Sequence, residues 1–263
     1  MQNHRFVFVC GLHRSGTSIM FRSLRDHPSL SGFHNTASPE DEGMHLQTVY
    51  HPSGHYGGAG KFGFNPEAHL TEASPLVTDA NRAKLFKEWS PYWEMEKPYL
   101  LEKSPPNIIR TRFLQAMFPD SYFIILLRHP LAVSYATRNW YKDYRIYWRS
   151  LSRILEHWLV CHEIFMQDRP HLKRTMILTY EQFVAEPSKW TNQIYNFLGV
   201  EDFPNQQKVL SGVNDKYFAK WRKDQQGFFS GFTTRSLIRR FETRFNRFGY
   251  SLVDLHRADF AEA

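Results

Sequence analysis

"FVFVCGLHRSGTSIMFRSL" (residues 6–24) is the stretch that decides the fold. It opens with the β-branched and aromatic residues of a buried strand, and glycines follow at Gly11 and Gly16. This is the glycine spacing of a phosphate-binding loop, G-x-x-x-x-G-K-[ST], and Ser18 stands where that motif ends. Thr17 occupies the place of the lysine that reaches the terminal phosphates of ATP in P-loop kinases. The stretch therefore predicts a strand, an anion-binding loop and a helix, with a nucleotide other than ATP.

The side chains of this loop suit a phosphate group. Arg14 is a bidentate donor, and hydroxyls of the following residues add further donors. The helix predicted to begin near Thr17 offers free N–H groups and the positive end of its dipole. A plain glycine-rich turn between strand and helix is the alternative interpretation. The phosphate-binding candidates are Arg14, Ser15, Gly16, Thr17 and Ser18.

The composition of the 263 residues is that of an ordinary globular protein, with 42% hydrophobic and 22% charged residues. The net charge of +7 would attract a polyanion, an acidic membrane surface or a charged nucleotide. Much of the excess lies in the last fifty residues, beside an apolar stripe of helical spacing from Ile238 to Phe248. We interpret these charges as the solvated face of an amphipathic helix and expect no nucleic-acid partner.

Cysteine content and apolar runs bear on the cellular location. Cys10 and Cys161 are the two cysteines, one in a predicted strand and one in a predicted helix, so no disulfide framework is expected. The sequence shows neither a charged leader with a cleavage site nor an apolar run of about 18 residues. A cytoplasmic protein without a membrane span is therefore expected.

Strand-type and helix-type segments alternate along the chain. We predict strands at 5–10, 30–33, 99–104, 121–128 and 174–180. We predict helices at 17–27, 80–93, 107–118, 131–141, 150–167 and 187–199. This alternation predicts an α/β fold with a central parallel β-sheet flanked by helices. We expect a single domain over residues 1–263, with a long irregular loop at 35–65 and a helical C-terminal segment at 205–263.

Ligands of parallel α/β sheets lie outside the carboxyl ends of the strands. The strongest predicted strand, "SYFIILLR", ends there in Arg128. An arginine that ends an apolar strand is costly to bury without an anionic partner. We expect a phosphate as this partner, and a protein carboxylate is the alternative interpretation.

Four segments, in this order along the chain, resemble the sulfotransferases that use 3'-phosphoadenosine-5'-phosphosulfate (PAPS). They are "HRSGTS" (13–18), "LLEKSPPNIIRTRFLQAMFP" (100–119), "IILLRHPLAVSYA" (124–136) and "LTYEQFVAEPSKWTNQIYNFLGV" (178–200). The resemblance is nearest to the bacterial, carbohydrate and tyrosyl-protein branches. It implies a P-loop NTPase-like sulfotransferase fold, PAPS as donor and 3'-phosphoadenosine-5'-phosphate (PAP) as product, and no metal.

The resemblance also implies roles for the donor-binding residues. Residues 13–18 match the family's 5'-phosphosulfate loop, and Arg128 matches the arginine that binds the 3'-phosphate. The family's 3'-phosphate serine commonly lies eight residues after this arginine, where the chain has Ala136. Ser134 and Thr137 share one helix face, and either could replace the missing hydroxyl.

Transfer of a sulfuryl group to a hydroxyl needs a cation near the leaving oxygen and a base for the acceptor proton. Lys103 directly follows "YLLE" (99–102) in the predicted strand and matches the family's "EKSP" pattern, and Arg14 could share its task. Glu42 in "SPEDEGMHL" is the first candidate for the base, and Glu40 is the second. Asp41 and His45 are further candidates, His45 because cytosolic members of the family use histidine.

The acceptor is expected to be a carbohydrate, a small molecule or a protein, and Tyr56, Phe62, Trp140, Tyr141 and Trp148 could cover it. Two other functions remain open at this point. A P-loop small-molecule kinase is disfavoured by Thr17 and by the lack of a strand ending in a convincing magnesium-binding aspartate. A non-catalytic nucleotide- or polyanion-binding protein would keep the loop without an active base.

Overall fold

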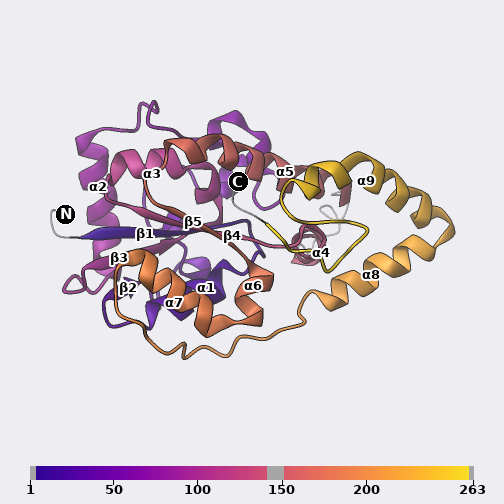
Figure 1. Ribbon diagram of the computed structural model, residues 1–263. Coiled ribbons are helices and arrows are strands. Elements are labelled where there is room, and N and C mark those ends of the chain that lie inside the picture. The colour runs from indigo at the N-terminus through magenta and orange to yellow at the C-terminus, as the bar shows by residue number, and fades with distance from the viewer. Residues whose placement is uncertain (1–3, 141–150, 261–263) are drawn as a thin grey trace.

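The computed structural model describes residues 4–140 and 151–260, and its centre is a five-stranded parallel sheet in the order β2-β3-β1-β4-β5 (Figure 1). The strands are β1 (Arg5–Cys10), β2 (Leu30–Gly32), β3 (Tyr99–Lys103), β4 (Tyr122–Leu127) and β5 (Thr175–Thr179). The central parallel sheet predicted from the sequence is thus confirmed.

The strand register brings the ends of the strands to one edge. Val9 of β1 lies opposite Lys103 of β3, and Leu127 of β4 lies opposite Thr179 of β5. Since all pairings are parallel, the segments that follow these strands leave the sheet at the same edge. The loop after β1 and Arg128 after β4 therefore start close together.

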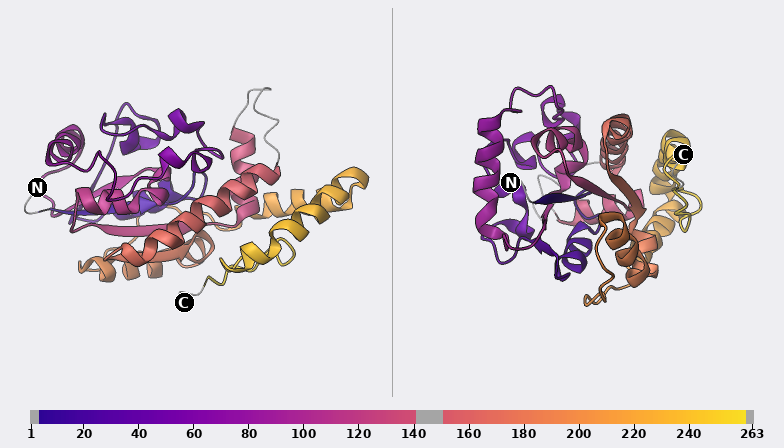
Figure 2. Two further views of the ribbon diagram at one scale, coloured as in Figure 1. Left: turned by 90° about the horizontal axis from the view of Figure 1, so that it is seen from above. Right: turned by 60° about the vertical axis from the view of Figure 1, so that its left-hand side comes forward.

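Helices cover both faces of the sheet (Figures 1 and 2). On one side lie α1 (Thr17–Arg25), α6 (Tyr180–Ala185) and α7 (Pro187–Leu198). On the other side lie α2 (Asp79–Trp89), α3 (Thr111–Met117) and α5 (Leu151–Asp168). The remaining helices are α4 (Pro130–Trp140), which follows β4, and the C-terminal α8 (Asp215–Gln226) and α9 (Phe228–Asn246).

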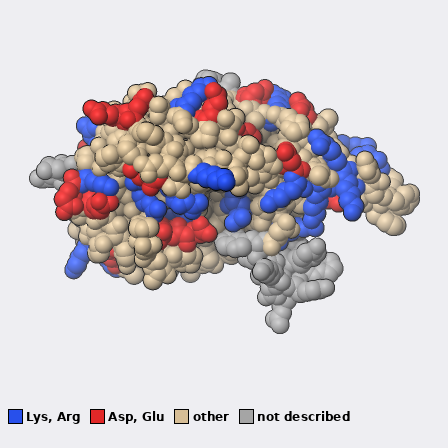
Figure 3. All heavy atoms as spheres, turned by 90° about the horizontal axis from the view of Figure 1, so that it is seen from below, with Lys and Arg blue, Asp and Glu red and all other residues tan. Residues whose placement is uncertain are grey.

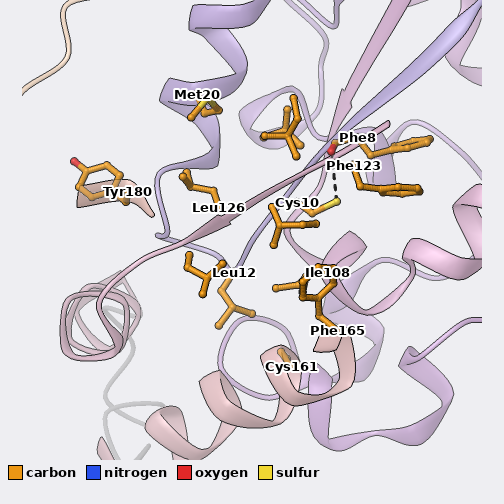
Figure 4. Packing of buried hydrophobic residues seen from close by; sticks show 14 of the residues in the cluster. Phe8, Cys10, Leu12, Met20, Ile108, Phe123, Leu126, Cys161, Phe165 and Tyr180 are labelled. Carbon is orange, nitrogen blue, oxygen red and sulfur yellow. Dashed lines mark hydrogen bonds between the residues drawn. The ribbon is translucent and has the colours of Figure 1, made fainter. Parts of the chain in front are cut away.

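The core explains why the strands read as continuous apolar runs. Phe8, Phe123 and Leu126 are fully buried, as expected for parallel strands that helices cover on both faces (Figure 4). Cys10 donates a weak hydrogen bond to the Phe8 carbonyl, and Cys161 is buried on α5, so both thiols are free. Burial raises the pKa of both thiols, which makes them unreactive packing residues.

The helix predicted at 107–118 is divided in two, which corrects the sequence-based boundary. A 3₁₀ segment covers Pro105–Ile109, and α3 begins only at Thr111. Arg110 separates them, and its buried guanidinium donates to the carbonyls of Ala68 (3.2 Å) and His51 (3.0 Å). The arginine thereby satisfies backbone oxygens of the long loop, and this tertiary contact takes precedence over helical propensity.

The long segment at 35–65 contains short 3₁₀ turns and no strand or α-helix in the structure. It packs onto the core through Met44 and Phe62, which are buried. The amphipathic stripe of the C-terminal helix is confirmed, since Phe241 and Phe245 are fully buried. Within residues 4–140 and 151–260, every helix is too short or too polar to cross a bilayer.

Candidate functional site

A cavity of about 270 Å³ lies where the segments after β1, β3 and β4 meet. Its lining residues are His13, Arg14, Gly16, Thr17, Ser18, Ile19, Arg22, Glu40, Glu42, Pro105 and Arg128. The structure thus brings together most of the site residues predicted from the sequence. Ser15, Lys103 and Ser134 are not among the side chains that line it.

The loop after β1 is shaped to hold an anion. Arg14 and Gly16 have positive φ angles of 69° and 98°, and Gly16 directly precedes α1. Ser15 is buried, and its hydroxyl donates to the Leu12 carbonyl at 2.6 Å, so this side chain stabilises the turn. No side chain of the described residues caps the first N–H groups of α1. These groups lie beside the cavity and can bind a phosphate.

Gly16 is required by both backbone and packing. Its φ of 98° is unfavourable for any residue with a side chain, and a Cβ atom there would overlap the Tyr180 ring. We expect Gly16→Ala to lower the free energy of unfolding by about 2 kcal/mol or more. Gly54→Ala is the control, because its Cβ would meet nothing within 4 Å. Denaturant unfolding of the two variants measures the difference, and equal stabilities would contradict this account of the loop.

Arg128 is a buried cation without a direct anionic partner. Its Nε and Nη2 donate to Asn214 Oδ1 at 2.9 and 2.7 Å, and Nη1 donates to the Arg14 carbonyl at 2.8 Å. The guanidinium lies over the Tyr180 ring, 4.1 Å from its centre. Among the described residues, no carboxylate forms an ion pair with it, and burial lowers its pKa. A bound anion in the cavity would supply the missing charge.

The two candidates for the missing hydroxyl differ in their surroundings. Ser134 is fully buried on α4, and its Oγ has no hydrogen-bond partner within the described part of the chain. Thr137 is also buried, but it lines a separate small cavity with His13 and His157. An unsatisfied buried hydroxyl is costly, which favours Ser134 as a ligand-binding group.

Glu42 and Lys103 form a buried ion pair at the cavity. Lys103 Nζ donates to Glu42 Oε1 at 3.0 Å and to the Glu40 carbonyl at 3.0 Å. The lysine is fully buried, whereas Glu42 reaches the cavity lining. Burial raises the pKa of Glu42, and Lys103 opposes this effect. The pair therefore presents an oriented carboxylate to the cavity, and Lys103 lines an adjoining cavity of about 240 Å³ together with Ser18 and Glu40.

Glu102, which precedes Lys103 on β3, helps to hold the Glu42 carboxylate in place. Its Oε1 accepts hydrogen bonds from the Gly43 N–H at 3.0 Å and from Ser104 Oγ at 2.5 Å, and Asn107 donates to Oε2. Burial raises the pKa of Glu102 to about 7, against the lowering effect of these hydrogen bonds. The contact to Gly43 fixes the backbone directly after Glu42.

The other candidates for the base lie in the same loop as Glu42. Glu40 lines the cavity and accepts a hydrogen bond from Ser18 at 3.2 Å. His45 Nε2 lies 3.9 Å from Glu42 Oε2 but does not line the cavity, and burial and Lys103 lower its pKa. Burial lowers the pKa of His13 to about 3, so the histidine of the loop is neutral at physiological pH.

Sequence reasoning missed several residues of the site. Arg22 lines the cavity one turn after Ser18, which helical spacing could have revealed. Asn214 Nδ2 donates to Glu181 Oε1 at 2.6 Å, and Glu181 also accepts from the His129 N–H at 3.1 Å. The "TYE" of the segment at 178–200 was the available signal for Glu181. Tyr141 and Trp148, proposed to cover an acceptor, lie outside the described residues.

Several solved structures that are similar to this chain are sulfotransferases. Sulfotransferase STF9 from Mycobacterium avium has a TM-score of 0.55 and 14% identity, covering 97% of this chain and 78% of that one, which shows a shared fold. The sulfotransferase domain of the Synechococcus PCC 7002 olefin synthase has a TM-score of 0.47 and 20% identity, with 82% of each chain covered. Mouse sulfotransferase SULT7A1, solved with PAP, has a TM-score of 0.42 and 13% identity, covering 86% of this chain and 68% of that one.

Among curated proteins, none matches the chain significantly in sequence. The profile described as "Sulfotransferase family" matches residues 7–205, a span that includes the loop after β1, the Glu42–Lys103 pair and Arg128. The matched span is most of the chain and contains every residue of the cavity lining. The chain therefore belongs to the sulfotransferase family.

Proposed function

We propose that this sulfotransferase moves the sulfuryl group of PAPS to a hydroxyl of an acceptor. The observation that carries the proposal is a single cavity that combines the uncapped start of α1 with Arg14 and Arg128 and contains the lysine-held carboxylate of Glu42. Cations and free N–H groups suit the two phosphate positions of PAPS. An oriented carboxylate suits removal of a proton from the acceptor.

Each residue has a defined task in this proposal. Arg14, Thr17, Ser18 and the backbone N–H groups of Gly16 and the start of α1 bind the 5'-phosphosulfate, and Ser15 keeps the loop in shape. Arg128 binds the 3'-phosphate. Ser134, whose buried hydroxyl is unsatisfied among the described residues but lies outside the cavity lining, is the candidate for a second donor. PAPS supplies the activated sulfuryl group. The acceptor oxygen forms a bond to sulfur as the bond from sulfur to the phosphate oxygen breaks, and PAP leaves.

Glu42 takes the proton of the acceptor hydroxyl. Lys103 lies 3.0 Å from the Glu42 carboxylate and is not part of the cavity lining. We therefore assign it first to the orientation of Glu42, and second to stabilisation of the leaving phosphate oxygen, which Arg14 shares. The acceptor class stays open among carbohydrates, small molecules and proteins.

Nucleotide binding tests the donor half of the proposal. We expect PAP to bind about 30-fold or more tightly than AMP, because a charge-assisted pair with the 3'-phosphate contributes about 2 to 3 kcal/mol. Arg128→Gln should weaken PAP binding to about the level of AMP and leave AMP binding nearly unchanged. Isothermal titration with PAP, AMP and ATP measures this.

The exposed Arg239→Gln is the matched control for the lost charge, and it should bind PAP as the wild type does. Equal affinity of the wild-type protein for PAP and AMP would refute the role of Arg128. Tight binding of ATP instead of PAP would favour the kinase alternative.

A further inference from the structure

The first turns of α9, directly after Gly227, carry an exposed aromatic cluster. Phe228, Phe229 and Phe232 have 77%, 83% and 62% of their surface exposed. The ring centres of Phe228 and Phe229 are 5.1 Å apart and those of Phe228 and Phe232 are 6.0 Å apart, so Phe228 packs against both of the others. The two helices project from the body of the protein and carry this cluster toward their outer end (Figure 1). We call the three rings the aromatic tip.

Helices α8 and α9, which we call the stem, carry the aromatic tip and pack firmly against the rest of the protein. Trp221 of α8 is fully buried, and its Nε1 donates to the Leu252 carbonyl at 3.0 Å. Phe241 and Phe245 of α9 are fully buried, and Arg244 forms ion pairs of 2.7 Å with both Glu156 and Glu163 of α5. The exposure of the tip is thus a feature of a packed hairpin, and its three large apolar side chains call for a partner.

Basic side chains predominate along α8 and the first part of α9, the helices that carry the aromatic tip, and Arg240 at the far end of this stretch is paired with Glu156 of α5. Residues 216–240 contain one acidic residue, Asp224, and seven basic ones: Lys216, Lys220, Arg222, Lys223, Arg235, Arg239 and Arg240. All of the basic residues except Lys220 are exposed. In the view from below, Lys and Arg gather along the stem up to the uncharged end of the hairpin (Figure 3). Arg235 also lies over the Phe232 ring, 4.6 Å from its centre.

The geometry points to an anionic lipid bilayer as the partner, and we propose that the aromatic tip docks onto the surface of such a bilayer. Exposed phenylalanines can enter the boundary between headgroups and acyl chains, while lysines and arginines attract anionic headgroups. Because the aromatic tip projects from the protein, it can enter a deformable surface such as a bilayer. A second copy of the chain would bring its own positive charge against the same patch, so like charges would oppose self-association.

Vesicle binding tests this proposal. With the full chain, we expect at least tenfold stronger binding to vesicles with about 30% phosphatidylserine than to pure phosphatidylcholine vesicles. The variant Phe228→Ser/Phe229→Ser/Phe232→Ser should bind the anionic vesicles at least tenfold more weakly than the wild type. Leu210→Ser/Val253→Ser is the matched control, since both residues are exposed apolar side chains outside the tip. It should bind as the wild type does.

A charge variant tests the attraction between the basic side chains and the anionic headgroups, and it leaves the apolar residues unchanged. Lys223→Gln/Arg235→Gln should lower binding to anionic vesicles by about tenfold. Lys84→Gln/Lys87→Gln, which removes two exposed lysines of α2, should leave it unchanged. Thermal unfolding of each variant checks that the fold is intact. No binding of the wild type to anionic vesicles would overturn the proposal. The proposal would also be overturned if the aromatic variant bound anionic vesicles as strongly as the wild type does. A third contradicting result would be self-association of the wild-type protein in sedimentation that is lost in the aromatic variant.

Discussion

Glu42→Gln is expected to lower kcat by about 100-fold or more while PAP affinity stays nearly intact. Gln keeps the size of Glu and can still accept a hydrogen bond from Lys103 Nζ, which lies 3.0 Å from Glu42 Oε1. It cannot take the proton of the acceptor hydroxyl. Binding and chemistry should therefore separate, which steady-state kinetics and titration with PAP together measure.

Glu40→Gln and His45→Ala are the matched controls, because both residues lie in the same loop as Glu42. Glu40 is the alternative acid of the cavity, and His45 lies outside the cavity lining. Both variants should retain kcat within about tenfold of the wild type. A normal rate for Glu42→Gln together with a dead Glu40 or His45 variant would move the base to that residue. Normal rates for all three would remove the base from this loop.

The pH profile gives an independent readout for Glu42. Because burial raises its pKa, the acid limb of kcat/KM should lie above the ordinary glutamate value of about 4.3. The rate should fall as the pH drops through this raised pKa, since only the deprotonated carboxylate can act as a base. The limb should disappear in Glu42→Gln. An unchanged limb in that variant would assign the titration to another group.

Arg14→Ala is expected to lower kcat/KM for PAPS by about 1000-fold, with losses in both donor binding and kcat. The side chain lines the cavity, and no hydrogen bond to the rest of the described chain competes for its guanidinium. Charge on the bridging oxygen grows as the sulfuryl group departs, so part of the interaction strengthens only in the transition state. Steady-state kinetics with varied PAPS separates the two losses.

Arg22→Ala is the control for a general loss of positive charge. Arg22 lines the same cavity and is also exposed, but it lies on α1 one turn beyond the loop. We expect its removal to change kcat/KM by less than about tenfold. An unchanged kcat in Arg14→Ala, or an equal effect in Arg22→Ala, would contradict the specific role of Arg14.

The fold could be predicted because its signals are local. Parallel strands covered on both faces read as short apolar runs, and glycine at 199 ended α7 as expected, with a positive φ of 75°. The boundary at 107–118 failed because Arg110 turns inward to satisfy carbonyls 42 and 59 residues away. No local pattern records such a contact.

The site residues, too, divide into those that a local sequence pattern could predict and those that depend on contacts between distant parts of the chain. The loop at 13–18 and Arg128 could be found from spacing and from the position of an arginine at a strand end. Asn214 could not, because it contacts Arg128 across 86 residues of sequence. Glu102 was hidden for another reason: it lies inside a strand, and its role depends on the Gly43 N–H, 59 residues earlier.

Transfer of radioactive sulfur from [³⁵S]PAPS tests the central claim most directly. The full chain would be incubated with [³⁵S]PAPS and pools of saccharides, phenols, hydroxylated small molecules and peptides, and both labelled product and PAP would be measured. We expect label in at least one acceptor pool, with one PAP formed for each group transferred and a rate reduced at least 100-fold by Glu42→Gln. Tight PAP binding without any transfer to these pools would contradict the account and leave a nucleotide-binding protein without this catalytic activity.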